Sequence, residues 1–366
     1  MGVTIYNVAK KAGVSTCWVS FVLRDHPRAK EVSQEVRDRI RNAAAELGYH
    51  RNVSAATISN GFNSSTIAML VPGNEVHDIR YMYPRYFETI RYFNLHGFGI
   101  RTYCDENMDK VLPEIASNQI RYVVCCRLEP EKRDLCAAFC RKHGLKAAFQ
   151  DDRREPYPDF LTFGSDDRAM TAEMVDYLYK LGHRRIGMAL GQFAYKSNEQ
   201  RYEGWLRGMA QHGLSDFSDL YFNTDGFSEQ VFLDFLREKR PTAIIAAGSE
   251  LAVRIIHFLR FYRIPVPQSV SLMSFGWEPK LDFYLPRPLT SMQELLLEQG
   301  NEKILQYFQG QLSPEIHSLF FCGQVHEGGT TAPPSGDFSW LERLPVSMEA
   351  DRKWFPDNEN PAQYRI

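Results

Sequence analysis

The first fifty residues carry apolar side chains at the three- and four-residue spacing of short amphipathic helices. Three helices are predicted, and their capping residues are Thr4, Ser15 and Ser33. Gly13 ends the first helix, the second runs through Leu23, and Gly48 ends the third. The side chains expected to form a small core are Ile5, Val8, Ala9, Ala12, Val19, Val22, Val36, Ile40, Ala43, Ala44 and Leu47. No strand is expected before residue 66.

Beyond that point, short apolar runs alternate with amphipathic segments of helix length. The predicted strands are Thr66–Val71, Ile100–Cys104, Tyr122–Cys126, Lys146–Phe149, Ile186–Leu190, Ala243–Ala247 and Val270–Phe275. Helices are expected between them, for example at Met170–Leu181 and Leu251–Tyr262. Such β-α-β alternation is typical of parallel sheets covered on both faces. At roughly 270 residues it exceeds one compact domain, so an α/β body of two lobes is expected.

Residues 335–366 break this alternation, because they carry mixed charge without a heptad or a clear period. They are expected to form an irregular extension that packs on the body through Trp340, Leu341 and Trp354.

The charge is unevenly distributed along the chain. Residues 1–61 hold nine Lys/Arg and five Asp/Glu, a net charge of +4, whereas the whole chain has −2 and the remainder therefore −6. A basic head on an acidic body suits a head that binds phosphates. No run of 18 apolar residues occurs, and the first residues lack the apolar stretch of a secretory signal, so a cytoplasmic protein is expected.

The seven cysteines are odd in number and form no C-x-x-C pair, which favours free thiols in a reducing compartment. Cys136 and Cys140 lie one helical turn apart and could share a metal, but no partner with matching spacing occurs. Thiols acting as small buried apolar groups are the preferred interpretation. Neither a metal nor a cofactor is expected.

Two of the predicted helices of the head are joined by a tight turn that contains Gly13, the spacing of a helix-turn-helix. In that motif the second helix enters the major groove with its N-terminal residues toward the bases, here Thr16, Cys17 and Trp18. Ordinary helical bundles share the spacing, so the spacing alone leaves DNA binding and simple packing both open.

Specific residues carry a resemblance beyond this spacing. In the head they are Thr4–Ser15, Val19–Ser20, Val22–Leu23 and Ala44–Tyr49, and in the body Leu181–Ile186, Arg201–Trp205, Pro241–Ile244, Val266–Ser271 and Pro288–Ser291. In this order they closely resemble the lactose-repressor/galactose-repressor family of bacterial transcription regulators. The resemblance runs from residue 4 to about residue 334 and leaves the tail out.

The resemblance implies a homodimer that binds double-stranded operator DNA and answers to a small-molecule effector. It implies a helix-turn-helix domain at 1–50, a hinge at 51–62 and a two-lobed domain like a periplasmic sugar-binding protein at 63–334, followed by the extension at 335–366. The residues that it places on DNA are Thr4, Tyr6, Ser15, Thr16, Cys17, Trp18, Ser20, Phe21, Asn52, Ala55 and Ile58. Ile58 falls where the family places an apolar wedge in the minor groove; the alternative is that Ile58 packs on the core.

The head departs from the family at two positions. Phe21 stands where Arg is common, and Trp18 where Thr is common. Aromatic side chains offer apolar contact, for instance to a thymine methyl, and no guanine readout. Phe21 could instead be a core residue. Either way, the operator is expected to differ from the usual family site.

The effector residues implied by the resemblance are Tyr81, Asp167, Arg201, Ser249 and Trp277. A carboxylate accepts hydroxyl hydrogens and a guanidinium donates in a planar fork, so Asp167 and Arg201 suit a saccharide or a derivative. The family's Asn-Asp is Gly248-Ser249 here, and its Asp-Asp is Gly276-Trp277. We expect either a ligand larger or more apolar than a free hexose, or a cleft plugged by Trp277.

Two other classes of protein suit the sequence less well. An enzyme would need a catalytic motif, but G-x-S-x-G, H-E-x-x-H and the P-loop are all absent from the sequence, so no catalytic residue is expected. Gly97-Phe-Gly99 resembles part of a dinucleotide motif but is interpreted as a helix stop before a strand. A cytoplasmic sugar-binding or sugar-processing protein would not need the basic head.

Overall fold

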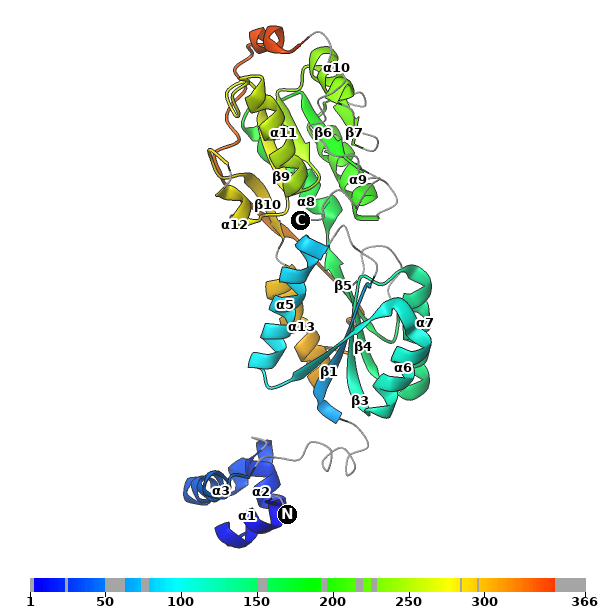
Figure 1. Cartoon of the computed structure of the whole chain (residues 1–366), viewed down its shortest axis with the longest axis vertical. Helices are drawn as coiled ribbons and strands as arrows, with labels where there is room; N and C mark the ends of the chain where they lie inside the picture. The colour runs from blue at the N-terminus through cyan, green and yellow to red at the C-terminus, as the bar shows by residue number, and fades with distance from the viewer. Residues whose placement is uncertain are drawn as a thin grey trace, which may run out of the picture. The chain divides into compact units, whose positions relative to one another are not determined.

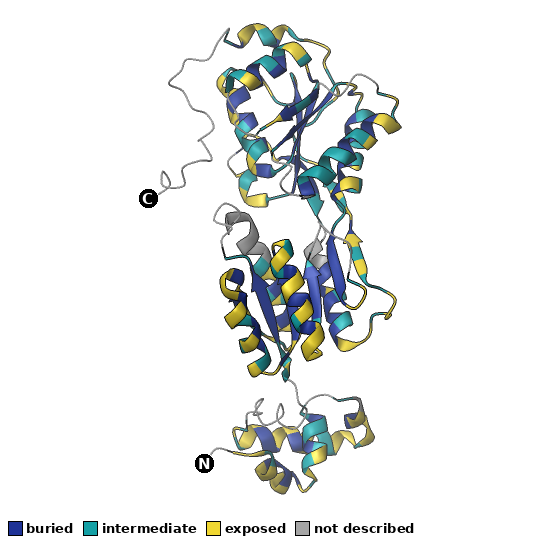
Figure 2. Ribbon diagram, turned by 90° about the vertical axis from the view of Figure 1, so that its right-hand side faces the viewer, coloured by how far each residue is buried: buried dark blue, intermediate teal, exposed yellow. Residues whose placement is uncertain are grey.

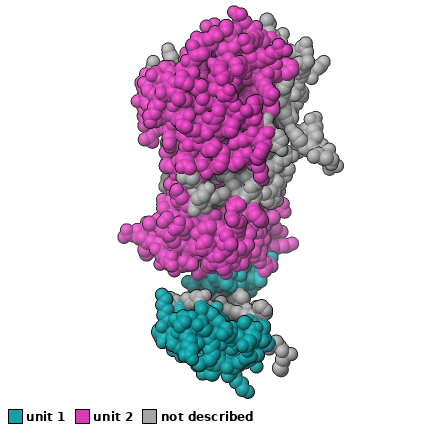
Figure 3. Space-filling view, turned by 90° about the vertical axis from the view of Figure 1, so that its left-hand side faces the viewer, with its two compact units in different colours: residues 1–66, 114–121 teal, residues 67–113, 122–366 magenta. Residues whose placement is uncertain are grey.

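In the computed structural model the described residues are 3–23, 26–49, 63–73, 79–150, 157–191, 196–214, 220–224, 229–283, 285–294 and 296–345. The chain divides into two compact units (Figure 3). The first unit comprises residues 1–66 with 114–121, and the second comprises residues 67–113 with 122–366.

The head of the first unit is helical, as predicted. Its elements are α1 (Ile5–Ala12), α2 (Thr16–Val22), the 3-10 helix η1 (Pro27–Glu31) and α3 (Gln34–Glu46). Gly13 follows α1 with a φ of 66°, a left-handed conformation that glycine adopts without a Cβ penalty. α2 ends one residue before the predicted Leu23, and η1 was not predicted. The buried core of the head is Val8, Ala9, Ala12, Val19, Val22, Ala29, Ile40, Ala43 and Ala44.

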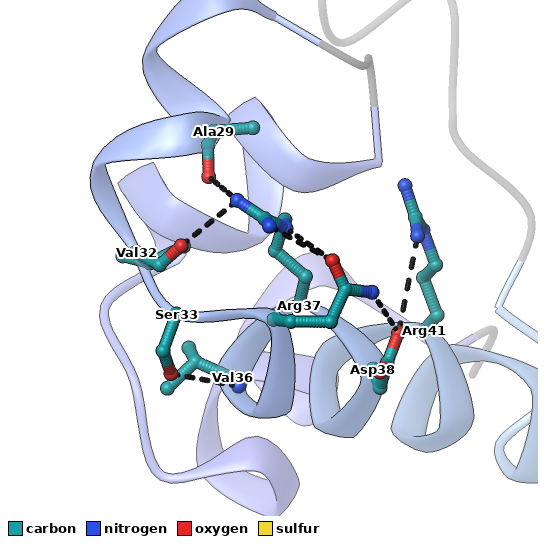
Figure 4. A network of polar contacts seen from close by, with 8 residues as sticks. Ala29, Val32, Ser33, Val36, Arg37, Asp38 and Arg41 are labelled. Atoms are coloured by element: carbon teal, nitrogen blue, oxygen red, sulfur yellow. Dashed lines mark hydrogen bonds and ion pairs between the residues drawn. The ribbon is translucent and has the colours of Figure 1, made fainter.

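Hydrogen bonds at the helix ends fix the head locally. The Ser33 Oγ accepts from the Val36 N–H at 3.3 Å and so caps α3 (Figure 4). The Arg37 guanidinium donates to the carbonyls of Ala29 at 3.1 Å and Val32 at 2.9 Å and thereby joins α3 to η1 (Figure 4). Ser15 occupies the predicted N-cap position of α2. Its side chain, however, makes no capping hydrogen bond, so the position of the cap is confirmed and its hydrogen bond is not.

One sheet of six strands, here called the first lobe with its helices, has the order β11-β5-β4-β3-β1-β2. The strands are β1 (Asn63–Val71), β2 (Gly99–Cys104), β3 (Ile120–Cys126), β4 (Lys146–Gln150), β5 (Leu161–Ser165) and β11 (Ser318–Phe321). The helical elements are α5 (Ile79–Leu95), η2 (Asp105–Asn107), α6 (Met108–Ser117), α7 (Pro130–His143) and α13 (Leu296–Gln309). Figure 1 shows α5 and α13 on one side of this sheet and α6 and α7 on the other.

The other six-stranded sheet, with its helices the second lobe, has the order β12-β10-β9-β8-β6-β7. Its strands are β6 (Ile186–Leu190), β7 (Tyr221–Asn223), β8 (Ala243–Ala246), β9 (Ser271–Phe275), β10 (Thr290–Glu294) and β12 (Gly323–His326). Its helices are α8 (Asp167–Lys180), α9 (Lys196–Gln211), α10 (Glu229–Lys239), α11 (Ser249–Phe261) and α12 (Pro279–Asp282). β10 pairs antiparallel with β12, whereas β6, β7, β8, β9 and β10 pair in parallel. The central strands are buried (Figure 2).

The α/β class and all seven predicted strands are confirmed, but β1 begins at Asn63, so the expectation of no strand before residue 66 was wrong. β5, β7, β10, β11 and β12 were not predicted. β10 is polar in sequence because hydroxyl side chains replace apolar ones in this part of the core, and β12 has a single apolar side chain, Val325. The Ser274 and Ser291 hydroxyls lie 2.8 Å apart, and those of Thr290 and Thr331 lie 2.9 Å apart.

The extension after residue 334 packs on the second lobe as far as it is described. Trp340, in η4 (Ser339–Arg343), is 2% exposed and belongs to the same apolar core as Phe258, and Leu341 packs against that core. The Arg237 Nη2 donates to the Leu344 carbonyl at 3.0 Å. The predicted packing through Trp340 and Leu341 is therefore confirmed, while Trp354 lies outside the described residues.

Candidate DNA-reading surface and effector site

The helix α2 separates its side chains into a buried pair and a group that reaches solvent. Val19 and Val22 are 0% and 1% exposed and anchor the helix in the head. The residues predicted on DNA in and before this helix keep access to solvent: Thr4, Tyr6, Ser15 and Cys17 are exposed, and Thr16, Trp18, Ser20 and Phe21 are half-buried. A helix fixed by one face with the other in solvent can enter a major groove.

Phe21 is the centre of a cluster that the sequence did not reveal. Its ring stacks on His26 with centroids 4.7 Å apart and meets Trp18 edge-on at 5.7 Å. The Arg28 guanidinium lies 5.1 Å from the Phe21 centroid and 6.0 Å from the Trp18 centroid. Phe21 is thus a half-buried ring that lies under a guanidinium. The sequence suggested either an apolar contact to DNA or a core position for Phe21, and neither alternative included this contact.

Arg28 is held in place by an acid one turn further along. Its Nε donates to the Glu31 Oε1 at 2.8 Å, and its Nη2 donates to the Oε2 at 3.1 Å. This forked hydrogen bond raises the pKa of Arg28 and lowers the pKa of Glu31, although both side chains remain exposed. No sequence signal singled out His26, Arg28 or Glu31, since they lie in a connection of irregular pattern.

The predicted hinge at 51–62 lies outside the described residues. Asn52, Ala55 and Ile58 are therefore not placed, and the wedge role of Ile58 stays a prediction.

In the second lobe the structure brings Asp167 and Arg201 together from two helices. Asp167 opens α8 and is 2% exposed; its Oδ1 lies 3.6 Å from the Nη2 of Arg201, on α9. The Nη1 of Arg201 donates to the Ala247 carbonyl at 2.7 Å, and the guanidinium lies 3.8 Å from the Phe275 ring centroid. Arg201 is therefore fixed by a carboxylate, a carbonyl and an aromatic face.

Trp277 and His326 form a second contact in this lobe, just after the end of β9. Trp277 is half-buried, and its ring lies 4.3 Å from that of His326 on β12, a residue that sequence reasoning missed. Ser249 begins α11 after β8 and is 5% exposed. Tyr81 lies in α5, but its side chain is not among the described ones.

These residues share one edge of the second sheet. Ala247 and Ser249 directly follow β8, and Trp277 follows β9, which ends at Phe275. In open α/β sheets, ligands bind outside the carboxyl ends of the strands. The predicted effector residues of this lobe thus lie where the fold class places ligands.

Two donors at this edge are left unsatisfied. The Arg201 Nε and the Trp277 Nε1 are buried and have no hydrogen-bond partner among the described residues. A buried donor without an acceptor costs roughly 1–3 kcal/mol, so such groups require an explanation. A ligand that brings acceptor oxygens would satisfy them.

Three of the seven cysteines form a compact group in the first lobe, whereas Cys17, Cys104 and Cys322 are exposed and so depart from the expectation of buried thiols. The Sγ atoms of Cys125 and Cys136 are 3.3 Å apart, and those of Cys136 and Cys140 are 3.9 Å apart, all buried. Burial raises the pKa of Cys126 to about 12. Within the described part of the chain, no cluster of three His, Cys, Asp or Glu side chains is arranged to hold a metal ion. None of the described helices combines the length and the apolar character that crossing a membrane requires.

Comparisons with known proteins agree with this architecture. Residues 4–52 match the family model of bacterial regulatory proteins of the lacI family, and residues 175–305 match the periplasmic binding protein-like domain. The HTH-type transcriptional repressor CytR of Escherichia coli (strain K12) is 25% identical over 348 residues, which covers 90% of this chain and 97% of that protein. The HTH-type transcriptional repressor PurR of Haemophilus influenzae is 24% identical over 318 residues, or 82% of this chain and 89% of that protein.

Two solved structures show the same fold. One is the lac repressor dimer bound to operator and the anti-inducer ONPF, with a TM-score of 0.62 at 20% identity over 91% of this chain and 100% of that one. The other is the complex of the transcriptional regulator CelR with cellobiose, with a TM-score of 0.58 at 18% identity over 90% of this chain and 99% of that one. The proteins named in these comparisons are transcription regulators and not enzymes.

Proposed function

The chain is a DNA-binding transcription regulator of the lacI family with a periplasmic-binding-protein-like effector domain, and from that premise we propose that it is a dimeric repressor released or strengthened by a saccharide derivative. The observation that carries the DNA-binding part is the head. α2 is anchored by Val19 and Val22, preceded by the Gly13 turn, and keeps Thr16, Cys17 and Ser20 accessible to solvent.

The dimer follows from the symmetry of operator recognition. A single short helix reads few bases, so two heads on an inverted repeat are needed for a specific site. Large apolar side chains that remain exposed in a single chain, Phe87 at 63% and Phe283 at 88%, suit an interface with a second copy. With no heptad in the tail, a dimer rather than a tetramer is expected; light scattering at the mass of four chains would contradict it.

The hinge supplies a separate test of the DNA-binding mode. If Ile58 opens a minor-groove step, Ile58→Ala leaves the melting temperature unchanged and weakens operator binding by on the order of a few kcal/mol. Binding to random DNA then changes little. An equal loss on random DNA would assign Ile58 to the support of the fold.

The effector part rests on the buried edge of the second lobe. Asp167 accepts hydroxyl hydrogens, and Arg201 and Trp277 each hold a buried donor without an acceptor. The donors of Arg201 and Trp277 favour a hydroxylated ligand that also carries acceptor oxygens. Trp277 offers a large rigid face for an apolar side of a sugar ring, which favours a ligand larger or more apolar than a free hexose.

The rival is a cleft closed by its own side chains. The contact of Trp277 with His326 and of Arg201 with Phe275 gives this alternative a specific basis. Calorimetry with a panel of saccharides, glycosides and nucleobases separates the two, because a ligand of the folded state raises the melting temperature. Arg201→Ala should abolish the shift and Trp277→Ala should reduce it. If no compound shifts the wild type, the sensing proposal fails.

A further inference from the structure

A cation that lies against side chains of α2 comes from outside that helix. Arg28 belongs to η1, yet its guanidinium lies against Phe21 and Trp18 of α2. Phe21 is half-buried: it packs against the head core that contains Val19 and Val22, and its ring also lies under the Arg28 guanidinium, so part of the side chain reaches the solvent side of α2. The charge of Arg28 is thus carried on the part of α2 that a groove would receive.

The hydrogen bonds of this guanidinium leave one edge open. Glu31 takes the Nε–H and one N–H of Nη2. Among the residues that the structure describes, the Arg28 Nη1 has no hydrogen-bond acceptor. The two Nη1 hydrogens and the second Nη2 hydrogen remain, and a guanidinium uses such a pair of parallel N–H groups to bind two acceptors at once.

The side chains around Arg28 restrict the rotation of its guanidinium. An arginine on an exposed surface loses side-chain entropy when it is fixed on a ligand. Here the acid and the two rings already hold the guanidinium, and an aromatic face attracts a cation without consuming its N–H donors. Arg28 is therefore an arginine prepared in advance for a planar partner that offers two acceptors.

We propose that Arg28 is a base-reading residue, which binds the O6 and N7 of a guanine in the major groove while Glu31, Phe21 and Trp18 position it. The inference rests on the proposed DNA binding, and it names one residue that recognises the operator and the base that this residue recognises. Guanine is the base whose major-groove edge presents two acceptors, and arginine is its commonest bidentate partner. α2 itself has no arginine or lysine, so this guanidinium supplies the charged readout that the helix lacks.

The test compares two arginine-to-lysine variants in the full-length protein. Arg28→Lys keeps the charge and removes the planar fork. Arg41→Lys is the matched control, because Arg41 also pairs with an acid three residues away, Asp38 at 4.0 Å, but lies on α3. Operators are selected from a random DNA pool with each protein, and affinities are then measured on the wild-type operator and on random DNA.

Arg28→Lys is expected to lose the preference for guanine at one symmetry-related pair of positions and to bind the wild-type operator at least tenfold more weakly. Its affinity for random DNA and its salt slope should remain, as should its melting temperature. Arg41→Lys should select the wild-type operator. Glu31→Gln, which weakens the fork that orients Arg28, should lower the discrimination at the same positions only.

Two results would overturn the inference and leave the proposed function intact. In the first, Arg28→Lys selects the wild-type operator with wild-type affinity. In the second, Arg28→Ala weakens operator and random DNA equally and lowers the salt slope by about one, the behaviour of a phosphate contact. If the wild type itself enriches no sequence, it is the proposed DNA-binding function that fails.

Discussion

The head and the second lobe each contain an arginine paired with an acid and stacked on an aromatic ring, in opposite surroundings. Arg28 and Glu31 have side chains 55% and 49% exposed, whereas Arg201 and Asp167 are 16% and 3% exposed. Exposed ion pairs contribute little to stability, while breaking a buried pair leaves an uncompensated charge. The same pair of residue types is therefore open to solvent in the head, where we propose a contact with DNA, and enclosed by protein in the second lobe, where it supports the edge at which we propose a ligand.

This difference assigns different consequences to changes in the two regions. In the head, a changed charge should alter DNA binding and leave stability nearly unchanged. In the second lobe, a changed charge or a removed ring should alter stability first.

The largest expected effect is at Trp340. Trp340→Ala removes a 2% exposed indole from the core of the second lobe and should lower the free energy of unfolding by about 3–5 kcal/mol through the cavity it leaves. Urea denaturation measures the loss. Trp18→Ala, at a half-buried ring of the head, is the control and should cost clearly less. Equal costs would mean that the extension is not part of the second-lobe core.

Asp167 gives the next largest effect and the sharpest control. Asp167→Ala leaves the Arg201 guanidinium without its carboxylate and should cost about 3 kcal/mol of unfolding free energy. Its neighbour Arg168 pairs with Glu203 at the surface, with side chains 45% and 39% exposed. Arg168→Ala should cost less than about 1 kcal/mol. Similar losses for the two variants would remove the contrast between buried and exposed pairs.

A smaller effect is expected at the helix caps of the head. Ser33→Ala removes the hydroxyl that accepts from Val36 and should destabilise α3 by about 1 kcal/mol. Ser15→Ala should have almost no effect on stability, because the Ser15 side chain makes no such bond. Hydrogen exchange of the α2 and α3 amides measures both. A larger loss at Ser15 would show that its hydroxyl is structural and not kept for DNA.

The smallest expected effect concerns pH. The His183 imidazole is buried, its Nε2–H donates to the Ala332 carbonyl at 2.9 Å, and burial lowers its pKa below the ordinary 6.5. Near pH 6 the unfolded chain therefore binds more protons at His183 than the folded chain does. The contribution of the neutral imidazole to the free energy of unfolding is complete above the pKa of the unfolded state and is lost as the pH falls from there through the lower pKa of the folded state. Melting temperatures between pH 5 and 8 should show a steeper acid slope for wild type than for His183→Asn; parallel slopes would contradict the assignment.

The parts of the fold that were predictable share one property, a strong apolar period. β6 was predicted with its observed bounds, because Ile186–Leu190 is apolar and fully buried. β10 was missed, because its burial relies on hydroxyls: Ser291 meets Ser274, and Thr290 meets Thr331. A polar strand has no apolar signature, and only the tertiary partners show that its groups are satisfied.

The sites divide in the same way. The positions of Asp167 and Arg201 followed from motifs, and the structure pairs them at 3.6 Å. The contacts of Arg28 with Phe21 and of His326 with Trp277 depend on how separate elements pack. His326 lies on β12, a strand that was not predicted, so the contact between His326 and Trp277 could not be anticipated from the sequence.

The most direct measurement of the central assignment is the selection of bound sequences from a random DNA pool by the wild-type protein, repeated at two salt concentrations. The account predicts one enriched inverted repeat with guanine at a symmetric pair of positions, and an affinity that falls steeply with salt because phosphates are neutralised. Enrichment of an asymmetric half-site, binding insensitive to salt, or no enrichment at all would contradict it.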